Sequence, residues 1–318
     1  MIHTMHLPDG FLAPQLALAL WVLTAVLVGI SLRRLAAGGA THGATGRPIL
    51  MGLVGAFIFA AQMFNFPVAA GTSGHLLGGV LAGYLLGPWA GTVVMTTVVG
   101  VQALLFQDGG LLALGANIFN MGILGTLGGS LIARALADAF GGRRGVGIAA
   151  AGVAGWLSVV TSAGVVTLQL GLSGTTDIAV GLPAMLGVHA LIGIGEALIT
   201  VAALTFIATT APDILGAETD HQPSPLRRFV SGTSVVVVVI ALAALFASTE
   251  PDGLNAVAAA LGFSTREAEA PLNLFAGYAI PGLDGASSTI VAALIGASVI
   301  AGLLLGLTRL AKSRTLQK

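Results

Sequence analysis

Long apolar segments follow one another along almost the whole chain, separated by short stretches that contain polar residues, glycine or proline. Most of them reach roughly 20 residues, the length that an α-helix needs to cross a hydrocarbon core of about 30 Å. The pattern predicts nine helical spans, at residues 12–33, 48–66, 75–87, 89–106, 111–135, 146–171, 183–210, 229–247 and 287–310. The third and fourth are short and meet at Gly87-Pro88.

A polar, proline-containing segment at 211–228 interrupts the apolar pattern and predicts a cytoplasmic linker between two modules. We therefore expect an all-α integral membrane protein with a seven-span bundle in 1–210 and a two-span module in 229–318. The segment 248–286 separates the last two spans and carries five acidic residues. It is long enough to form a small cap outside the membrane.

Composition supports this interpretation, because 56% of the residues are hydrophobic and only 8% are charged. A soluble domain could not bury so much apolar surface in its core, so the bilayer must act as the solvent. The net charge is zero, which gives no reason to expect a nucleic-acid partner. The chain has no cysteine, which excludes disulfides and thiolate metal ligands. Any metal ligand must be histidine, carboxylate or backbone.

The distribution of basic residues predicts the orientation in the membrane, because lysine and arginine are retained on the cytoplasmic side. With the amino terminus outside and the carboxyl terminus in the cytoplasm, twelve of the thirteen basic residues lie inside and only Arg266 lies outside. The reverse orientation would place those twelve on the wrong face. We expect an integral protein of a prokaryotic cell (inner) membrane in the first orientation.

Glycines recur every four residues at Gly79, Gly83, Gly87 and Gly91, and Gly125/Gly129 and Gly302/Gly306 repeat the spacing. Such stripes allow helix backbones to approach closely in lipid. We interpret them as packing features rather than as chemistry.

Three of the six histidines are expected on the outer side: His3 and His6 near the amino terminus, and His75 at the start of the third span. A free α-amine followed closely by histidine can supply amine, amide and imidazole nitrogens in one plane. A distant histidine would add a fourth nitrogen, and a square-planar nitrogen set suits Ni(II) or Cu(II), with Co(II) also plausible.

His189 lies near the outer end of the seventh span, with Glu196 seven residues later on the same helical face. An ionisable residue within the membrane is a functional candidate by default. The alternative is a hydrogen-bonded structural pair between helices. His42 and His221 fall in loops, where solvated side chains are expected.

Five segments carry a resemblance to a known family: MHLPDGFL (5–12), NFPVAAGTSGHL (65–76), QALLFQDGG (102–110), GANIFNM (115–121) and HALIGIGE (189–196). They resemble CbiM/NikM, the substrate-binding components of energy-coupling-factor transporters for cobalt and nickel. The resemblance covers about residues 5–210. Beyond the linker, PDGL (251–254) and GYAIPG (277–282) resemble the PDGLE domain, a NikN-like small component, although Asn255 stands where the motif has glutamate.

The resemblance implies that the cation is held by the amine and amide nitrogens of Met5-His6, by the imidazole of His6 and by His75. The family motif begins at the initiator methionine, whereas four residues precede Met5 in this sequence. Either the mature chain starts at Met5, or the amine of Met1 and the imidazole of His3 form a different clamp. The sequence leaves nickel and cobalt equally open, because nitrogen ligands accommodate both.

The resemblance also implies a separate transmembrane coupling subunit and a pair of cytoplasmic ATPases as partners. The chain carries no Walker loop, so we expect a transport subunit without enzymatic activity. Cobalt or nickel would be its transported substrate, and no permanently bound cofactor is expected.

Two other functions fit parts of the sequence. Gly71-Thr72-Ser73-Gly74 matches the short pattern around the nucleophile of a rhomboid-like intramembrane serine protease, with His189 on another helix. The outer histidines would equally serve a passive metal channel.

Overall fold

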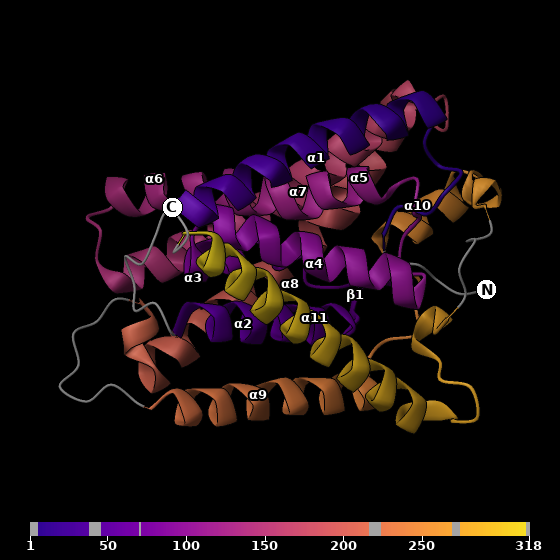
Figure 1. The fold of residues 1–318 in the computed structure, drawn as a ribbon. Helices are drawn as coiled ribbons and strands as arrows, with labels where there is room; N and C mark the ends of the chain where they lie inside the picture. Colours follow the sequence, from indigo (N-terminus) through magenta and orange to yellow (C-terminus); the bar gives the residue numbers. More distant parts are fainter. Residues whose placement is uncertain (1–5, 38–45, 70, 216–223, 269–273, 316–318) are drawn as a thin grey trace.

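The computed structural model describes residues 6–37, 46–69, 71–215, 224–268 and 274–315 (Figure 1). These residues form α1 (Pro14–Ala37), α2 (Gly46–Gln62), β1 (Phe66–Ala69), β2 (Thr72–Gly74), α3 (Gly79–Leu86), α4 (Pro88–Phe106), α5 (Leu114–Asn117), the π-helix η1 (Ile118–Gly128), α6 (Gly129–Ala139), α7 (Arg144–Leu172), α8 (Ile178–Thr210), η2 (Pro212–Leu215), α9 (Pro225–Phe246), α10 (Gly253–Ala260), η3 (Ser264–Arg266), η4 (Ala276–Tyr278) and α11 (Gly285–Thr315).

Seven helical stretches within the described part of the chain are long and apolar enough to cross a membrane. They are α1, α4, the continuous run Leu114–Ala139, α7, α8, α9 and α11. The apolar part of α2, Pro48–Gln62, is shorter. The predicted all-α membrane fold is therefore confirmed, although the number of full-length spans is smaller than expected.

The segment 75–87 is not a full span, contrary to the sequence-based expectation. Its helix, α3, has eight residues, and a helix of that length extends only about 12 Å. Gly78 before α3 and Gly87 after it have φ angles of 78° and 82°, in the left-handed region that glycine adopts readily. These two glycines limit α3 to two turns, which are mostly buried among α4, η1 and α7.

A small β-hairpin precedes α3, where the sequence pattern predicted the end of one span and a loop. Strand β1 pairs antiparallel with β2, with Phe66 opposite Gly74 and Pro67 opposite Ser73. The hairpin carries the chain from α2 to His75. It therefore positions the histidine on an ordered segment rather than at the start of a helix.

Close backbone contact joins α3 to η1. A Cβ atom built on Gly79 would lie 2.6 Å from the Met121 carbonyl oxygen and 2.8 Å from the Gly125 Cα. The predicted packing role of the glycine stripe is confirmed here. Among the described residues of this chain, a Cβ atom at Gly87, Gly302 or Gly306 would meet nothing within 4 Å, so the prediction stays untested at these glycines.

The two predicted modules share one hydrophobic core. Helices α9 and α11 pack against α2, as Figure 1 shows along the lower side of the bundle. Phe59 of α2, Ile240 of α9 and Ile300 of α11 are buried in the same cluster. The carboxyl-terminal helices therefore form part of the bundle.

The segment between α9 and α11 covers one end of the bundle. Ser248 donates its backbone N–H to the Asn65 carbonyl at 2.7 Å, and the Ser73 N–H donates to the Pro251 carbonyl at 2.9 Å. Asp252 forms an isolated parallel bridge with Ser73, so this segment pairs with the hairpin at one point. Helix α10 follows at the end where α1 begins (Figure 1). We call residues 248–268 and 274–284 the cap.

Candidate metal centre

The amino-terminal segment from His6 to Leu12 is buried except at Gly10, and hydrogen bonds hold it to the end of α5. The Leu7 N–H donates to Asn117 Oδ1 at 3.1 Å, and Asn117 Nδ2 donates back to the Leu7 carbonyl at 3.0 Å. The Gly110 N–H donates to the same carbonyl at 2.9 Å. This arrangement fixes the backbone immediately after His6.

Asp9 holds the same segment from the other side. Its two carboxylate oxygens accept the backbone N–H groups of Leu111 and Ala113, each at 3.0 Å. The Asp9 carbonyl accepts the N–H of Ala268 from the cap at 2.8 Å. Residue Asp9 of the motif at 5–12 thus links the loop after α4 to the cap.

His6 presents one ring nitrogen to the loop and the other to a cavity. Nδ1 lies 3.0 Å from the Asp108 carbonyl oxygen and 3.5 Å from Asp108 Oδ1. Because a carbonyl oxygen can only accept, Nδ1 is the donor here, and in the neutral tautomer the lone pair is on Nε2. Nε2 is buried and has no hydrogen-bond partner among the described residues. A buried nitrogen lone pair of this kind is suited to a metal ion.

His75 lies beside His6, with the ring centroids 5.5 Å apart and the rings nearly perpendicular. Its Nδ1 donates to the Leu76 carbonyl at 3.0 Å. The side chain is buried, with 7% exposed. The structure therefore brings together the two histidines that the sequence placed near the outer surface, although they are far apart in the chain.

Glu196 of α8 positions the backbone that follows His75. Its carboxylate accepts the Leu77 N–H at 2.6 Å and the Gly78 N–H at 3.0 Å. Gln62 Nε2 donates to the Leu77 carbonyl at 2.8 Å. Glu196 thus holds the segment that leads into α3. These hydrogen bonds satisfy a carboxylate that has no exposed surface.

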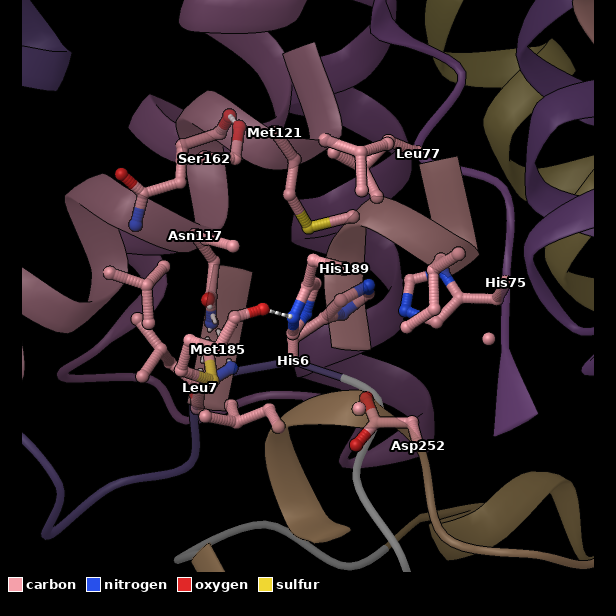
Figure 2. Close-up of a pocket in the computed structure, with 18 residues that line it drawn as sticks. His6, Leu7, His75, Leu77, Asn117, Met121, Ser162, Met185, His189 and Asp252 are labelled. Carbon is pink, nitrogen blue, oxygen red and sulfur yellow. Dashed lines mark hydrogen bonds between the residues drawn. The ribbon is translucent and has the colours of Figure 1, made fainter. Parts of the chain in front are cut away.

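His189 lines the same cavity as His6 and His75, as Figure 2 shows. Its Nδ1 donates to the Met185 carbonyl one turn earlier at 2.8 Å, and the Glu196 carboxylate accepts from the backbone of Leu77 and Gly78. A Cβ atom built on Gly253 would lie 3.0 Å from His189 Cε1. The cap therefore packs directly on this imidazole.

Asp252 brings a carboxylate from the cap to the cavity (Figure 2). Its Oδ1 accepts the Asn255 N–H at 2.8 Å and caps α10. Burial raises the pKa of Asp252 to about 7, while the nearby charge of His75 acts in the opposite direction. The sequence analysis did not distinguish Asp252 from the other acidic residues of the cap. Its place in the PDGL motif was the signal that could have done so.

Several methionines and histidines considered in the sequence analysis lie in parts of the chain that the structure does not describe. Met5, Met1 and His3 lie outside the described residues, as do His42 and His221. Within the described ranges, no group of three or more histidine and acidic side chains has metal-binding geometry. Among the described side chains, the imidazoles of His6 and His75 lie side by side.

Ser73 does not form the pair that the protease hypothesis requires. Its hydroxyl donates to the Glu250 carbonyl at 2.7 Å, which ties the hairpin to the cap. Since His189 Nδ1 is bonded to its own helix, the described contacts give this serine a structural role.

Comparison with known proteins agrees with the fold. The family model for CbiM, the cobalt uptake substrate-specific transmembrane region, matches residues 6–214, and the PDGLE domain matches residues 227–313. Together with seven potential membrane spans, this defines a metal-transport component of the membrane. The chain belongs to the CbiM family and carries a PDGLE domain.

Three relatives illustrate the similarity. A putative fused nickel transport protein NikMN from Archaeoglobus fulgidus is 36% identical over 97% of this chain and all of its own length. A putative metal transport protein from Haloquadratum walsbyi is 40% identical over 66% of this chain and 93% of its own length. The crystal structure of a truncated transition metal transporter, 29% identical, matches 64% of this chain and 99% of its own, with a TM-score of 0.57.

Proposed function

We propose that this chain binds a divalent nickel or cobalt ion from outside the cell and delivers it into an energy-coupling-factor transporter. The observation that carries the proposal is the pair of buried imidazoles of His6 and His75, whose ring centroids lie 5.5 Å apart at one cavity. The amine and amide nitrogens of Met5-His6 would complete a four-nitrogen set, as the family resemblance implies. If the chain begins at Met1, its amine and His3 would form the terminal clamp instead.

Metal titration of the purified chain tests the ligand assignment. We expect His6→Ala and His75→Ala each to weaken nickel or cobalt affinity by more than about 100-fold. Removing a ligand should lower metal affinity more than removing a residue that only hydrogen-bonds to a ligand, which costs up to about 100-fold. His189→Ala is the matched control, since this imidazole lines the same cavity but is outside the proposed ligand set. Unchanged affinity in both His6→Ala and His75→Ala would contradict the assignment.

Intact mass of the same preparation decides between the two amino-terminal clamps. A mass beginning at Met5 supports ligation by the Met5 amine. A mass beginning at Met1 excludes that amine and supports the clamp with His3.

The same proposal assigns transport energy to partner proteins: a transmembrane coupling subunit and two cytoplasmic ATPase subunits. Metal uptake by cells should then require these subunits together with this chain. Uptake at the full rate without them would indicate a passive channel instead.

We further propose the division into a metal-binding component at 1–210, a cytoplasmic linker at 211–228 and a PDGLE module at 229–318, with the amino terminus outside and the carboxyl terminus in the cytoplasm. The absence of cysteine makes labelling a clean test, because a single introduced thiol has no background. Thr265→Cys in the cap should react with an impermeant maleimide in intact cells. Gly145→Cys, at the opposite end of the bundle, should react only after permeabilisation, and the reverse result would overturn the orientation.

A further inference from the structure

The cavity beside His6 and His75 is lined by residues of both modules (Figure 2). The carboxyl-terminal module contributes Asp252, Gly253 and Leu254, at the start of α10. Among the described residues that line the cavity, Asp252 is the one acidic side chain, and none is lysine or arginine. Only 5% of Asp252 is exposed. A buried carboxylate of the cap therefore borders the same space as the two candidate ligands.

The position of Asp252 is fixed close to His75. The Ser73 N–H, two residues before His75, donates to the Pro251 carbonyl at 2.9 Å, and Ser73 forms an isolated bridge with Asp252. At the side chain, Asp252 Oδ1 accepts the Asn255 N–H at 2.8 Å. These contacts hold the carboxylate against the hairpin that leads to His75.

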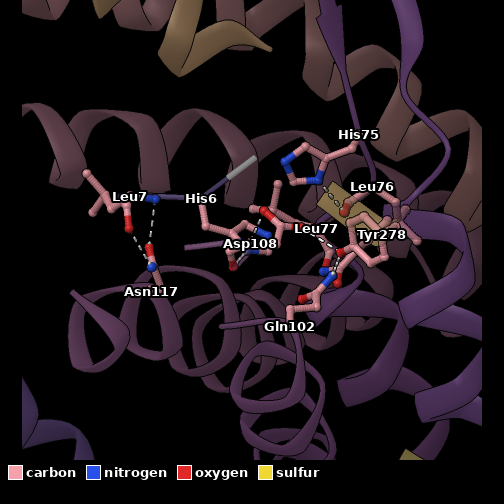
Figure 3. A network of polar contacts seen from close by, with 10 residues as sticks. His6, Leu7, His75, Leu76, Leu77, Gln102, Asp108, Asn117 and Tyr278 are labelled. Atoms are coloured by element: carbon pink, nitrogen blue, oxygen red, sulfur yellow. Dashed lines mark hydrogen bonds and ion pairs between the residues drawn. The ribbon is translucent and has the colours of Figure 1, made fainter. Parts of the chain in front are cut away.

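A second acidic side chain, Asp108, lies behind His6 (Figure 3). It is not among the described residues that line the cavity. Its Oδ2 accepts the Tyr278 hydroxyl at 2.7 Å, and its Oδ1 lies 3.5 Å from His6 Nδ1. Asp108 is thus engaged on both carboxylate oxygens, whereas Asp252 is the carboxylate that borders the space available to an ion.

Burial of the Asp252 carboxylate is costly in the protein without metal. Loss of hydration raises the pKa of Asp252 to about 7, while the nearby charge of His75 opposes this shift and that of Asp108 adds to it. A buried charge is normally retained where it is paired. An imidazole that binds metal must be neutral, so the candidate ligands themselves cannot provide the opposite charge.

The charge of the proposed metal complex matches this carboxylate. A divalent ion with one deprotonated amide nitrogen and otherwise neutral nitrogen ligands carries one net positive charge. In a buried cavity such a charge interacts with its neighbours more strongly than it would in water, and salt screens the interaction less. A carboxylate that is costly without metal is therefore stabilised when the ion is bound.

We propose that Asp252 supplies the negative charge that retains the divalent cation in this cavity. Its carboxylate acts through space rather than as a ligand, because no group of three or more histidine and acidic side chains among the described residues has metal-binding geometry. The carboxyl-terminal module thereby contributes charge to the metal site of the first module. This inference rests on the proposed function, because it requires the ion to bind at His6 and His75.

Asp252→Asn tests the charge with little change of shape. Asparagine caps a helix about as well as aspartate, so α10 should keep its first turn. The full chain is titrated with nickel alone at about pH 8, above the pKa of Asp252 of about 7. We expect affinity to fall about 30-fold, equivalent to about 2 kcal/mol. This is the scale for opposite unit charges about 8 Å apart at an effective dielectric constant of about 20. The visible ligand-field spectrum of bound nickel should not change.

Glu250→Gln is the matched control, because it removes the same charge from the same segment of the cap at an exposed position. Water and salt screen an exposed charge, so nickel affinity should change less than about twofold. An equal loss of affinity in Glu250→Gln and Asp252→Asn would overturn the proposal, since the effect would then belong to the cap as a whole.

Thermal unfolding without metal separates the loss of charge from structural damage. Asp252→Asn should melt at the wild-type temperature or above it, because it removes a costly buried charge. A structural role predicts a lower melting temperature together with weaker binding, and that result would overturn the proposal. Should Asp252→Asn not fold, Asp252→Ser also provides an oxygen that caps α10 and is the second test, with the same expectations.

Wild-type nickel affinity in Asp252→Asn would likewise overturn the proposal. So would a shifted spectrum of bound nickel, which would show that the carboxylate acts on the coordination of the ion instead of through space. Failure of the wild type itself to bind nickel or cobalt would instead defeat the proposed function.

Discussion

Glu196→Gln tests whether the backbone after His75 must be held in place for metal binding. The substitution is nearly isosteric, but it replaces one acceptor oxygen by an NH2 group. The two wild-type oxygens accept from Leu77 and Gly78 at 2.6 and 3.0 Å. In the variant, one of these N–H groups would face another donor and lose its partner.

The structure sets the expected magnitude. Glu196 has no exposed surface, so water cannot replace the lost acceptor. A hydrogen bond to a charged group contributes about 1.5–3 kcal/mol, and a buried unsatisfied donor costs a similar amount. If that free energy is needed to hold His75 in position, about 2–3 kcal/mol corresponds to a 30- to 150-fold loss of metal affinity.

The assay is metal titration together with thermal unfolding of the same detergent-solubilised protein. Gln62→Met provides a graded control, because Gln62 makes one neutral hydrogen bond, of 2.8 Å, to the Leu77 carbonyl of the same segment. Its loss of about 1 kcal/mol predicts a roughly fivefold change in affinity. Wild-type affinity in Glu196→Gln, with stability lowered as expected, would refute the link between this carboxylate and His75. Wild-type affinity with wild-type stability would refute the hydrogen bonds themselves.

Three further variants test other parts of the structure. Burial raises the pKa of Asp252 from 3.8 to about 7 on folding, so the metal-free wild type should lose stability as the pH rises from about 4 to 7. Asp252→Asn cannot ionise and should remove up to about 4 kcal/mol of this loss. An equal pH dependence of the melting temperature in both proteins would contradict this expectation. Gly79→Ala should lower the melting temperature by overpacking worth about 1–3 kcal/mol, whereas Gly302→Ala, which meets no neighbouring atom within 4 Å, should not. Asn117→Ala should weaken metal affinity roughly tenfold by releasing Leu7, and unchanged affinity would argue against anchoring of the amino-terminal segment.

Much of the fold is determined by hydropathy. Because the bilayer accepts only helices with satisfied backbone groups, long apolar runs such as 146–171 and 183–210 predicted α7 and α8 closely. The same rule failed at 75–87, because composition does not reveal that glycines end α3 after two turns. The hairpin before it was also missed, since it is formed by a short segment of mixed character.

Position along the chain placed His3, His6 and His75 on one side of the membrane, and the family resemblance selected His6 and His75 as candidates. The contacts that make them a site depend on residues distant in the chain. Asp108 is 102 residues from His6, and Glu196 is 119 residues from Leu77. Periodicity and motif spacing describe neighbours along the chain, whereas these hydrogen bonds depend on how helices and loops pack in space. The sequence by itself therefore determined a helical membrane protein with a few outer histidines. Only the tertiary structure showed that His6 lies beside His75 and that Glu196 holds the backbone after His75.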